Sequence, residues 1–430
     1  VVPLPDGAAA LPNPSAPLER QIIVKEGPQK GLSLQGAGVP ALLISGQAGD
    51  LPGQAELLDD DARRLAVSSG TVVDTLPEKQ TVPDSTTFEQ LNGSGLTAEE
   101  LWPGIEIPID QTRWGHPVSG TSVHLIGSYT PLPPSFGGEV LVSVGTETIA
   151  RWLVEPSGVI DKTVTIPERL MKRVTTLEVS VRSTGDPGSC GDHLPMLLRL
   201  DGATTIAMRD AIPPVPQGFQ SLPQALMPRL RIGIGEDAFG DTARAAQIIV
   251  GLRRASATPL LTEVTGLQEA LAAGDPAVLI APGGWNNNQI ALPFTTDQGK
   301  LTVTGLDAKD QSVTLTLEPA APFASLQTVF DGKRSVLIAT STGAPGLLDD
   351  LLRNLVSVPG RWSGLDGRAI LSAPGADPIT IPNPPIDYSG QPQANQESDQ
   401  EGGWFWWAAG AVAVLAGLGA IAILLRARRT

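Results

Sequence analysis

The sequence predicts a multidomain α+β protein in which a β-sandwich and an α/β domain precede a single C-terminal transmembrane helix. Three observations lead to this fold class. Residues 102–211 contain short strand and turn patterns alone, residues 229–375 alternate strands with helices, and residues 404–425 form an unbroken apolar run. Successive short strands are typical of a sandwich, and alternating strands and helices are typical of a mostly parallel sheet with helices on both faces.

The first 76 residues are predicted to be a disordered start followed by a piece of an α/β layer. Residues 1–19 are rich in Pro and Ala, a composition that favours disorder. The elements expected within residues 20–76 are strands at 21–27, 32–36, 39–46 and 71–76 and a helix at 51–67. Residues 77–100 are polar, carry prolines and glycines, and are predicted to be a linker.

Residues 101–211 are predicted to form the β-sandwich. Apolar and polar residues alternate in its strands, with Val140, Val142 and Val144 in one and Leu177, Val179 and Val181 in another. Side chains of a strand point alternately to its two faces, so this pattern places one face of each strand in a core.

The α/β domain is predicted at residues 229–375, between two linkers. The preceding linker, 212–228, is rich in Pro, and the following one, 376–403, is rich in Pro, Gln and acidic residues. A faint repeat connects this domain with the start of the chain. Residues 39–69 and 334–358 share a buried strand, a Gly-containing loop and a helix rich in Leu and Asp. The first segment is therefore interpreted as the second half of the same domain type.

Residues 404–425 are predicted to cross a membrane. As a helix the run would reach about 33 Å, and a hydrocarbon core is about 30 Å thick. Its aromatic start contains Trp404, Trp406 and Trp407, and Arg426, Arg428 and Arg429 follow its end. Because basic residues favour the cytoplasmic side, the tail 426–430 is predicted to be cytoplasmic and everything before residue 404 to be extracytoplasmic, on the periplasmic or cell-envelope side. A buried core helix is the alternative, but such a helix rarely lacks a polar face over this length.

Small residues within this run suggest a second use for it. Ala409, Ala413 and Gly417 follow one another at intervals of four, a spacing that permits close packing of transmembrane helices. The lipid bilayer and a membrane protein are therefore predicted partners.

Charge and cysteine content restrict the remaining classes. The net charge is −15, and all acidic residues precede residue 404, so nucleic acid is not expected as a partner. Cys190 is the single cysteine, which excludes an intramolecular disulfide. It is predicted to be a small core residue, with a reactive or intermolecular thiol as the alternative.

Enzyme signatures are sparse. The three histidines, His116, His124 and His193, form no HExxH pattern, and the chain has no GxSxG, so no metal, cofactor or catalytic residue is expected. Glycines 233, 235 and 240 follow a strand, but their spacing fits neither nucleotide-binding motif. Asp237 and Asp241 beside them are interpreted as helix caps.

Paired carboxylates leave a glycosidase as an open alternative. The candidates are Glu139, Glu147 and Glu155 in the sandwich and Glu99 and Glu100 in the connector. Each is interpreted more simply as a solvated surface residue.

Aromatic residues point to glycan binding, because sugar rings stack on aromatic faces while amides bond their hydroxyl groups. Trp285 is the leading candidate, since Asn286 and Asn287 follow it in a loop and exposure is expected there. The further candidates are Trp102, Trp114 and Tyr129, whereas Trp152 is expected in the core.

The order of these segments resembles the BcsB family of bacterial cellulose synthase components. The stretches SYTPLPPSFGGEVLVSVGTETIARWLV and VTIPERLMKRVTTLEVSVRS carry the resemblance, followed by Cys190, an α/β domain and a terminal apolar run. It would span residues 20–425, as the end of one flavodoxin-like domain, a carbohydrate-binding sandwich, a second flavodoxin-like domain and an anchor. The first sandwich of the family and half of a domain have no counterpart in this sequence.

The resemblance implies a non-catalytic component that binds and guides an exported polysaccharide and packs on a membrane family-2-type glycosyltransferase that uses UDP-glucose. The family is also associated with cyclic di-GMP, which the acidic composition disfavours here. A membrane-anchored adhesin or scaffold is the alternative, and a glycoside hydrolase is the third possibility.

Overall fold

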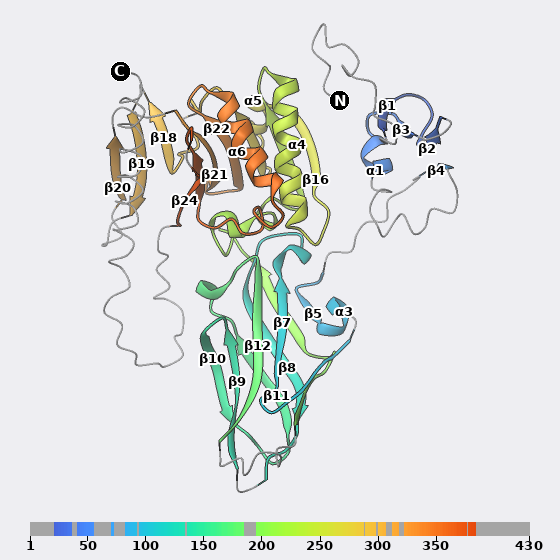
Figure 1. Cartoon of the computed structure of the whole chain (residues 1–430), viewed down its shortest axis with the longest axis vertical. Helices are drawn as coiled ribbons and strands as arrows, with labels where there is room; N and C mark the ends of the chain where they lie inside the picture. The colour runs from blue at the N-terminus through green and yellow to red at the C-terminus, as the bar shows by residue number, and fades with distance from the viewer. Residues whose placement is uncertain are drawn as a thin grey trace. The chain divides into compact units, whose positions relative to one another are not determined.

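The computed structural model describes residues 21–36, 41–55, 70–72, 82–92, 94–133, 136–184, 195–287, 289–297, 300–306, 312–317, 322–375 and 377–383. The chain divides into two compact units, residues 1–80 and 81–430. The second unit contains a β-sandwich and an α/β domain (Figure 1).

The first unit is a small sheet with the order β1-β3-β2-β4. Its elements are β1 (Ile22–Glu26), β2 (Gly31–Gln35), β3 (Ala41–Gly46), α1 (Leu51–Ala55) and β4 (Gly70–Thr71). β1 runs parallel to β3, and β2 is antiparallel to both β3 and β4. Every residue of β1 is exposed, because β1 lies at the end of the described sheet.

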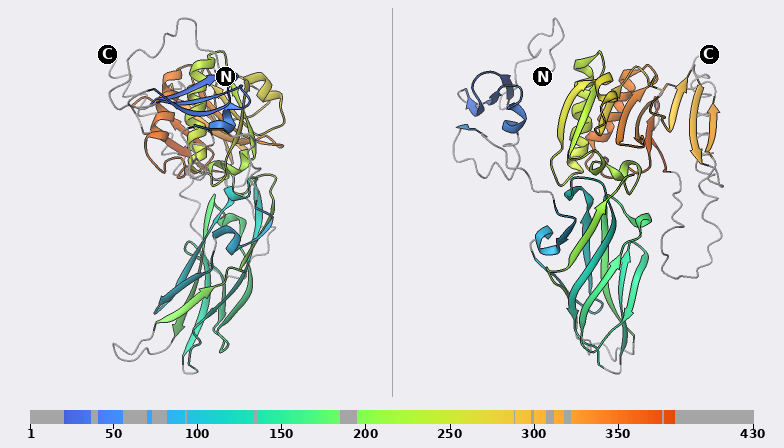
Figure 2. Two further views of the ribbon diagram at one scale, coloured as in Figure 1. Left: turned by 90° about the vertical axis from the view of Figure 1, so that its right-hand side faces the viewer. Right: turned by 180° about the vertical axis from the view of Figure 1, so that it is seen from behind.

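The sandwich packs two sheets face to face (Figure 2). One has the order β10-β9-β12-β7; the other has the order β5-β14-β8-β13-β6, with β11 also paired to β8. The first sheet contains β7 (Gly104–Asp110), β9 (Gly137–Val144), β10 (Glu147–Leu153) and β12 (Val174–Thr184). The second contains β5 (Ser85–Thr87), β6 (Leu96–Glu100), β8 (Val118–Tyr129), β11 (Val159–Thr165), β13 (Met196–Leu200) and β14 (Thr205–Asp210). Short helical segments accompany them: α3 (Phe88–Asn92), η2 (Gln111–Arg113) and η3 (Glu168–Leu170).

The alternation of apolar and polar residues in the sandwich strands corresponds to an alternation of buried and more exposed side chains. Val140 and Val142 of β9 and Leu177 and Val179 of β12 are fully buried, which confirms the predicted inward face of both strands. At about 25 cal/mol per Å² of apolar surface, such burial is the main stabilising contribution to the sandwich.

The predicted linker 77–100 differs from the structure. Residues 85–100 form β5, α3 and β6, which complete the second sheet of the sandwich. Glu99 and Glu100 pair with Leu197 and Met196 of β13. Sequence reasoning missed β5 and β6 because β5 has only three residues and both strands carry many polar ones.

The Pro-rich segment 212–228 is part of the α/β domain rather than a free link. It contains η4 (Gly218–Ser221) and η5 (Gln224–Leu226). Phe219, Leu222 and Leu226 are buried in the main core of that domain. Val215 of the same segment packs against the sandwich core, so the segment joins the two domains and contacts both.

A seven-stranded mixed sheet, ordered β16-β15-β17-β22-β21-β23-β24, forms the α/β domain. The first four strands are parallel, and β21, β23 and β24 are added antiparallel to their neighbours. The strands are β15 (Arg229–Ile234), β16 (Leu261–Gly266), β17 (Ala277–Ala281), β21 (Ala324–Phe330), β22 (Ser335–Ser341), β23 (Ala369–Ser372) and β24 (Ile379–Ile381). A separate antiparallel sheet holds β18 (Phe294–Asp297), β19 (Lys300–Leu306) and β20 (Ser312–Leu317).

Helices cover both faces of this mixed sheet. α4 (Ala238–Arg254) and α6 (Pro345–Ser357) lie side by side on one face (Figure 1) and share the main core with Val278 and Ile280 of β17. α5 (Leu267–Ala272) contacts the other face, where Ala277 and Leu279 point. Successive residues of β17 thus enter two different cores, which explains its uninterrupted apolar sequence.

The repeat seen in the sequence has a structural counterpart. The order β1-β3-β2-β4 of the first unit matches β17-β22-β21-β23, with the same strand directions. The register also agrees: Leu32 pairs with both Ile44 and Thr71, and Leu326 pairs with both Ala339 and Ile370. The described part of the first unit therefore corresponds to the β17–β23 half of the α/β domain.

The fold class predicted from the sequence is wrong in two respects: the proportion of strands to helices, and the terminal transmembrane helix. Strands provide most of the regular structure in the described residues, and two of the seven strands of the sheet, β21 and β24, run opposite to the others. No helix in this part of the chain is long and apolar enough to cross a membrane. Among the helices described, α4 is the longest with 17 residues, and it carries charged side chains.

The prediction of a transmembrane helix relied on the apolar run, its aromatic start and the arginines that follow it, and the structure gives it no support. The run 404–425 lies outside the described residues, together with its candidate anchor and helix-packing residues. The same holds for the start of the chain, 1–19, for Cys190 and for His193.

Candidate functional site

The carboxyl ends of the parallel strands form the first candidate site, because open α/β sheets bind ligands where the strand order reverses. Here the chain moves from β15 to β16 on one side and then to β17 on the other. β15, β17 and β22 end at Ile234, Ala281 and Ser341. α4 begins beside this edge.

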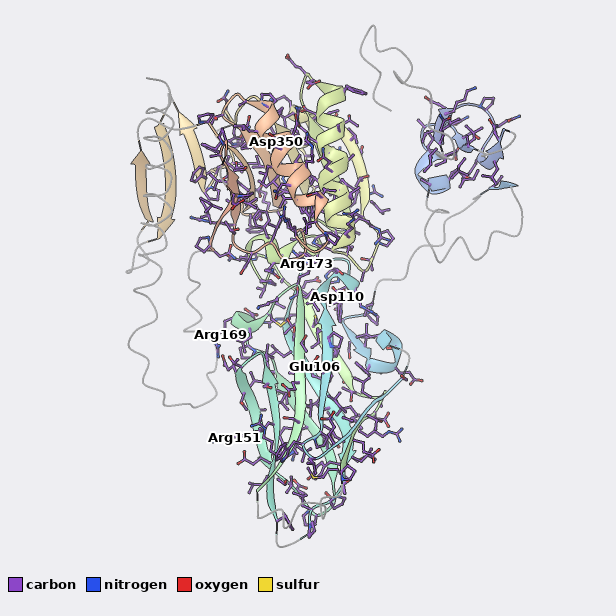
Figure 3. The ribbon with its side chains drawn as sticks, in the orientation of Figure 1. Glu106, Asp110, Arg151, Arg169, Arg173 and Asp350 are labelled. Carbon is purple, nitrogen blue, oxygen red and sulfur yellow. The ribbon has the colours of Figure 1, made fainter. Side chains whose placement is uncertain are left out.

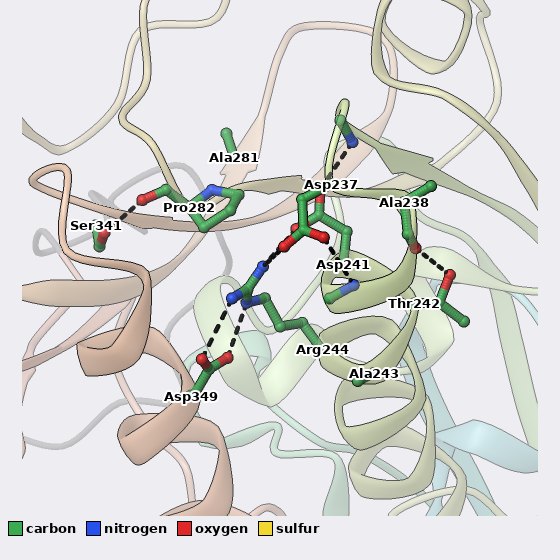
Figure 4. Close-up of polar contacts among 12 residues, drawn as sticks. Asp237, Ala238, Asp241, Thr242, Ala243, Arg244, Ala281, Pro282, Ser341 and Asp349 are labelled. Carbon is green, nitrogen blue, oxygen red and sulfur yellow. Dashed lines mark hydrogen bonds and ion pairs between the residues drawn. The ribbon is translucent and has the colours of Figure 1, made fainter. Parts of the chain in front are cut away.

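A buried arginine and three aspartates occupy the edge (Figure 4). Arg244 donates from Nη1 to Asp241 at 2.8 Å, and from Nε and Nη2 to the two oxygens of Asp349 at 2.8 and 3.2 Å. Asp237 lies 3.5 Å from Nη1. Asp241 also accepts a hydrogen bond from the Gly235 N–H at 2.8 Å. The cluster fastens the start of α4 to α6.

The electrostatics of this cluster oppose binding of a phosphate. Burial disfavours the charged guanidinium, but hydrogen bonds from Asp349 and Asp241 outweigh it and raise the pKa of Arg244. One cation then faces three carboxylates, so the edge keeps negative charge. Helix N-termini attract anions through free N–H groups, whereas here Asp237 accepts from the Gly240 N–H at 3.1 Å. A nucleotide or a cyclic dinucleotide would meet like charge.

The three glycines of this region have structural tasks. A Cβ on Gly233 would lie 2.8 Å from the Cβ of Ala270, so the glycine allows α5 to approach β15 closely. The N–H groups of Gly235 and Gly240 donate hydrogen bonds to Asp241 and Asp237, respectively. Asp237 caps α4, as expected from the sequence.

Trp285 lies on the same edge, beyond the end of β17, but it is half-buried rather than exposed. Its ring packs against the core between β17, β22 and α5, and its Nε1 donates to the Ile290 carbonyl at 3.3 Å. The cavity beside it measures only about 20 Å³. Asn287 accepts hydrogen bonds from the N–H groups of Gln289 and Ile290, so it shapes the loop, whereas Asn286 is exposed.

The sandwich aromatics also differ from expectation. Trp114 is 0% exposed and Tyr129 is 4% exposed, both in the sandwich core, so neither can offer a ring to a sugar. The Tyr129 hydroxyl instead accepts from the Glu155 N–H at 2.6 Å. Trp102 is 64% exposed and keeps the geometry that stacking requires. Composition cannot separate these cases, because all three stand near turns in the sequence.

The candidate glycosidase carboxylates do not form a pair across β9 and β10. Glu147 lies opposite Val144, whereas Glu139 lies opposite Leu153, which separates them by five residues, or about 17 Å at about 3.4 Å each. Glycosidase carboxylates are about 5–9.5 Å apart. A hydrogen bond from Arg169 lowers the pKa of Glu147, which opposes a general-acid role. Glu155 lies 3.8 Å from Lys162.

A second candidate site is the amino-edge cleft, which lies where β21 ends and β22 begins. Its volume is about 390 Å³, within the range of small-molecule sites. The lining residues are Pro213, Pro214, Gln217, Gly218, Ser221, Ala291, Leu292, Pro293, Thr328, Val329, Phe330, Ser335, Arg368 and Asn383.

This cleft combines an aromatic ring and prolines with two amides, hydroxyl groups and one cation. The Asn383 side chain donates to the Gln217 carbonyl at 3.2 Å, which joins two of its walls. Gly218 has φ +72°, and a Cβ there would collide with the Asn383 side chain and with the Gly367 carbonyl. Burial lowers the pKa of Arg368. The lining therefore offers both hydrogen-bond donors and hydrogen-bond acceptors beside an apolar face.

The junction cavity, of about 530 Å³, lies between the sandwich and the α/β domain. Arg173 and Asp110 mark this end of the sandwich (Figure 3). Arg173 donates to the carbonyls of Ser363 and Phe219, each at 2.7 Å, and to that of Leu222. Burial lowers its pKa to about 10, although Asp110 and Asp366 act in the opposite direction. These bonds secure the junction, and the cavity lacks an aromatic lining residue.

Sequence reasoning missed the amino-edge cleft entirely. Gln217, Phe330 and Asn383 come from segments that are far apart in the chain, and none belongs to a recognisable motif. The one available signal was an amide among the prolines of 212–228.

Comparison with known proteins gives no family. No family model and no curated protein sequence matches the chain. Among solved structures, an acetyl xylan esterase from the rumen bacterium Butyrivibrio proteoclasticus has 11% sequence identity and a TM-score of 0.16. The match covers 43% of this chain and 49% of that chain. At that TM-score the similarity carries no argument about fold or function.

Proposed function

We propose that this protein is a non-catalytic component of a polysaccharide synthase that binds the exported polymer, with the amino-edge cleft as the binding site. The observation that supports this proposal is the lining of the cleft, which includes the ring of Phe330 and the amides of Gln217 and Asn383. A sugar ring needs an apolar face for its C–H groups and paired donors and acceptors for its hydroxyl groups. The cavity beside Trp285 is too small for a sugar ring, at about 20 Å³, and the junction cavity has no aromatic lining residue.

The charge of the molecule favours a neutral glycan over a nucleotide or a polyanion. The net charge is −15, and the carboxyl edge of the sheet presents carboxylates around Arg244. Arg368 adds a partly desolvated cation to the lining of the cleft, because burial lowers its pKa. Hydrogen bonds from a charged donor to hydroxyl oxygens are stronger than those from a neutral one.

The partner in this proposal is a membrane family-2-type glycosyltransferase, and the place of action is the extracytoplasmic side, where its polymer emerges. The order of segments and the resemblance to the BcsB family support this part. The two domains, joined through Arg173, would hold the polymer near the exit of the enzyme.

Binding to cellohexaose tests the cleft. We expect Phe330→Ala to weaken binding about tenfold, because an aromatic contact contributes up to about 1.5 kcal/mol, and Gln217→Ala to weaken it less. The matched control is Trp102→Ala, which removes an exposed ring outside the cleft and should bind like the wild type. Isothermal titration calorimetry measures all three, with circular dichroism as a check on folding. If Trp102→Ala loses binding and Phe330→Ala keeps it, the site belongs to the sandwich surface.

Purification of the intact chain from its native membranes tests the partner. We expect a multi-pass glycosyltransferase to accompany it, identified by mass spectrometry. A chain that binds cellohexaose yet purifies without any glycosyltransferase contradicts the synthase role and favours an adhesin.

A further inference from the structure

Three metal-ligating side chains meet on the sandwich at the end nearest the α/β domain. Asp84 precedes β5, His116 lies between η2 and β8, and Asp210 ends β14. Their ligand atoms all lie within 4.8 Å of one another. The His116 Nδ1 atom is 3.1 Å from Asp210 Oδ1. Neither the proposed glycan site nor the domain junction uses them.

Backbone hydrogen bonds hold the three segments together. The Met208 N–H donates to the Asp84 carbonyl at 2.7 Å, and the Ala211 N–H donates to the Pro117 carbonyl at 3.0 Å. β14 pairs with both β5 and β8, and Asp210 lies opposite Val118. The sheet therefore holds the three backbone segments next to one another.

The spacing of the ligand atoms suits a small divalent cation. Zn²⁺ binds His nitrogen and Asp oxygen at about 2.0–2.2 Å, which places neighbouring ligand atoms of a tetrahedral site about 3.3–3.6 Å apart. The His116–Asp210 distance is close to this already. The other two distances are at most 4.8 Å. The Asp210 side chain is 82% exposed, so rotation about its side-chain bonds can change its distance to Asp84.

The charge of the cluster also favours a cation. Two carboxylates face one imidazole, and within the described residues neither Asp84 nor Asp210 pairs with a lysine or arginine. A second histidine–aspartate pair on the same sandwich, His124 and Asp161 at 2.7 Å, lacks a third ligand among the described residues. Imidazole nitrogen favours Zn²⁺ over the oxygen-seeking Ca²⁺ and Mg²⁺.

We propose that Asp84, His116 and Asp210 bind a Zn²⁺ ion, with water at the fourth position. The ion would join the segment entering the sandwich, the turn before β8 and the end of β14. The last of these leads directly into residues 212–228, which pack on the α/β domain. Zn²⁺ would thus stabilise the end of the sandwich that carries the junction.

Calorimetry and thermal unfolding of the untagged full chain with ZnCl₂ test this assignment. We expect one Zn²⁺ per chain and a melting temperature that rises and saturates with the metal, because binding to the folded state alone stabilises it. His116→Ala and Asp84→Asn should each weaken binding by about tenfold or more, by analogy with the loss seen when groups of a metal site are removed. Ca²⁺ and Mg²⁺ in excess should not displace the metal.

His124→Ala is the matched control, since it removes a histidine from the two-residue pair, and it should bind Zn²⁺ like the wild type. Asp84→Asn keeps the Asp84 backbone carbonyl that Met208 uses, so it remains informative if His116→Ala folds poorly. The assignment is overturned if the wild type binds no Zn²⁺ at micromolar concentration. It is equally overturned if His124→Ala removes the binding while His116→Ala and Asp84→Asn retain it.

Discussion

The sheet of the first unit and the β17–β23 half of the α/β domain share strand order, direction and register, yet their strands are buried to opposite extents. Every residue of β17 is buried, whereas every residue of its counterpart β1 is exposed. By register, Ile22 corresponds to Val278, since these residues pair with Leu42 and Leu337 at matching positions of β3 and β22.

The neighbours of each strand explain the difference. β15 pairs with the edge of β17 that faces away from β22, and α4 and α5 lie over the two faces of the sheet at β17. Among the described residues of the first unit, nothing equivalent covers β1. An apolar strand sequence such as IIV therefore specifies the tendency to form a strand, while its burial depends on what packs around it.

The largest expected effect comes from placing a charge at equivalent positions of the two strands. Val278→Lys should prevent the α/β domain from folding, because an unpaired buried charge costs several kcal/mol and Val278 is 0% exposed. Ile22→Lys, at a residue 61% exposed, should change the free energy of unfolding by about 0.5 kcal/mol or less. Urea unfolding of the intact chain with peptide-level hydrogen exchange distinguishes the two. Equal damage from both would show that β1 is covered in solution.

The next effect concerns the ion cluster of Arg244. The first unit carries Asp59 and Asp60 where the α/β domain carries Asp349 and Asp350, but the arginine belongs to α4, which has no described counterpart there. Arg244→Ala should lower the free energy of unfolding by about 3–5 kcal/mol, since it leaves buried Asp241 without its cation.

The control for that variant is Arg353→Ala. Arg353 pairs with Asp350 on the surface, and both side chains are more than half exposed. Such pairs contribute little, so thermal unfolding should match the wild type. A small effect of Arg244→Ala would mean that Asp241 is solvated in solution.

The smallest effect is a pH dependence at the turn between β21 and β22. Burial opposes ionisation of Asp331, but hydrogen bonds from the N–H groups of Arg334 and Lys333 and from the Arg334 guanidinium outweigh it and lower its pKa. A lowered pKa stabilises the fold above the unfolded-state pKa of about 3.9. This stabilisation is lost as the pH falls through the lower pKa of the folded state.

Asp331→Asn should reduce stability at pH 7 by about 1.5 kcal/mol, the size of one hydrogen bond to a charged group. The wild type should lose this advantage as the pH falls below about 5. The free energies of unfolding of the wild type and of Asp331→Asn, plotted against pH, should therefore converge at acidic pH. The corresponding connection in the first unit, residues 36–40, has no acidic residue. Its sequence therefore offers no counterpart to this source of pH dependence.

Periodicity explains which parts of the fold could be anticipated. The inward residues of β9 and β12, such as Val142 and Val179, were readable because every second residue is apolar. β5 and β6 could not be read in this way. A three-residue strand such as β5 is too short to show a period, and the pairing of Glu99 with Leu197 depends on tertiary structure.

The candidate site was less accessible from sequence than the fold. Trp114 and Trp102 are the same residue type in similar turns, yet one is buried and the other is largely exposed. Phe330 and Asn383 meet only because β21 and the end of β24 converge at one edge of the sheet. Such convergence depends on the strand order, which residue types do not encode.

Arg173 has a mechanical consequence. Its guanidinium binds the carbonyls of Phe219, Leu222 and Ser363, and the hydroxyl of Thr112 accepts from the Ala257 N–H at 2.8 Å. Two separate points of attachment oppose twisting of one domain against the other, which a single flexible peptide link does not. If the α/β domain binds the polymer as proposed, a pull on the polymer would also be transmitted to the sandwich through these hydrogen bonds.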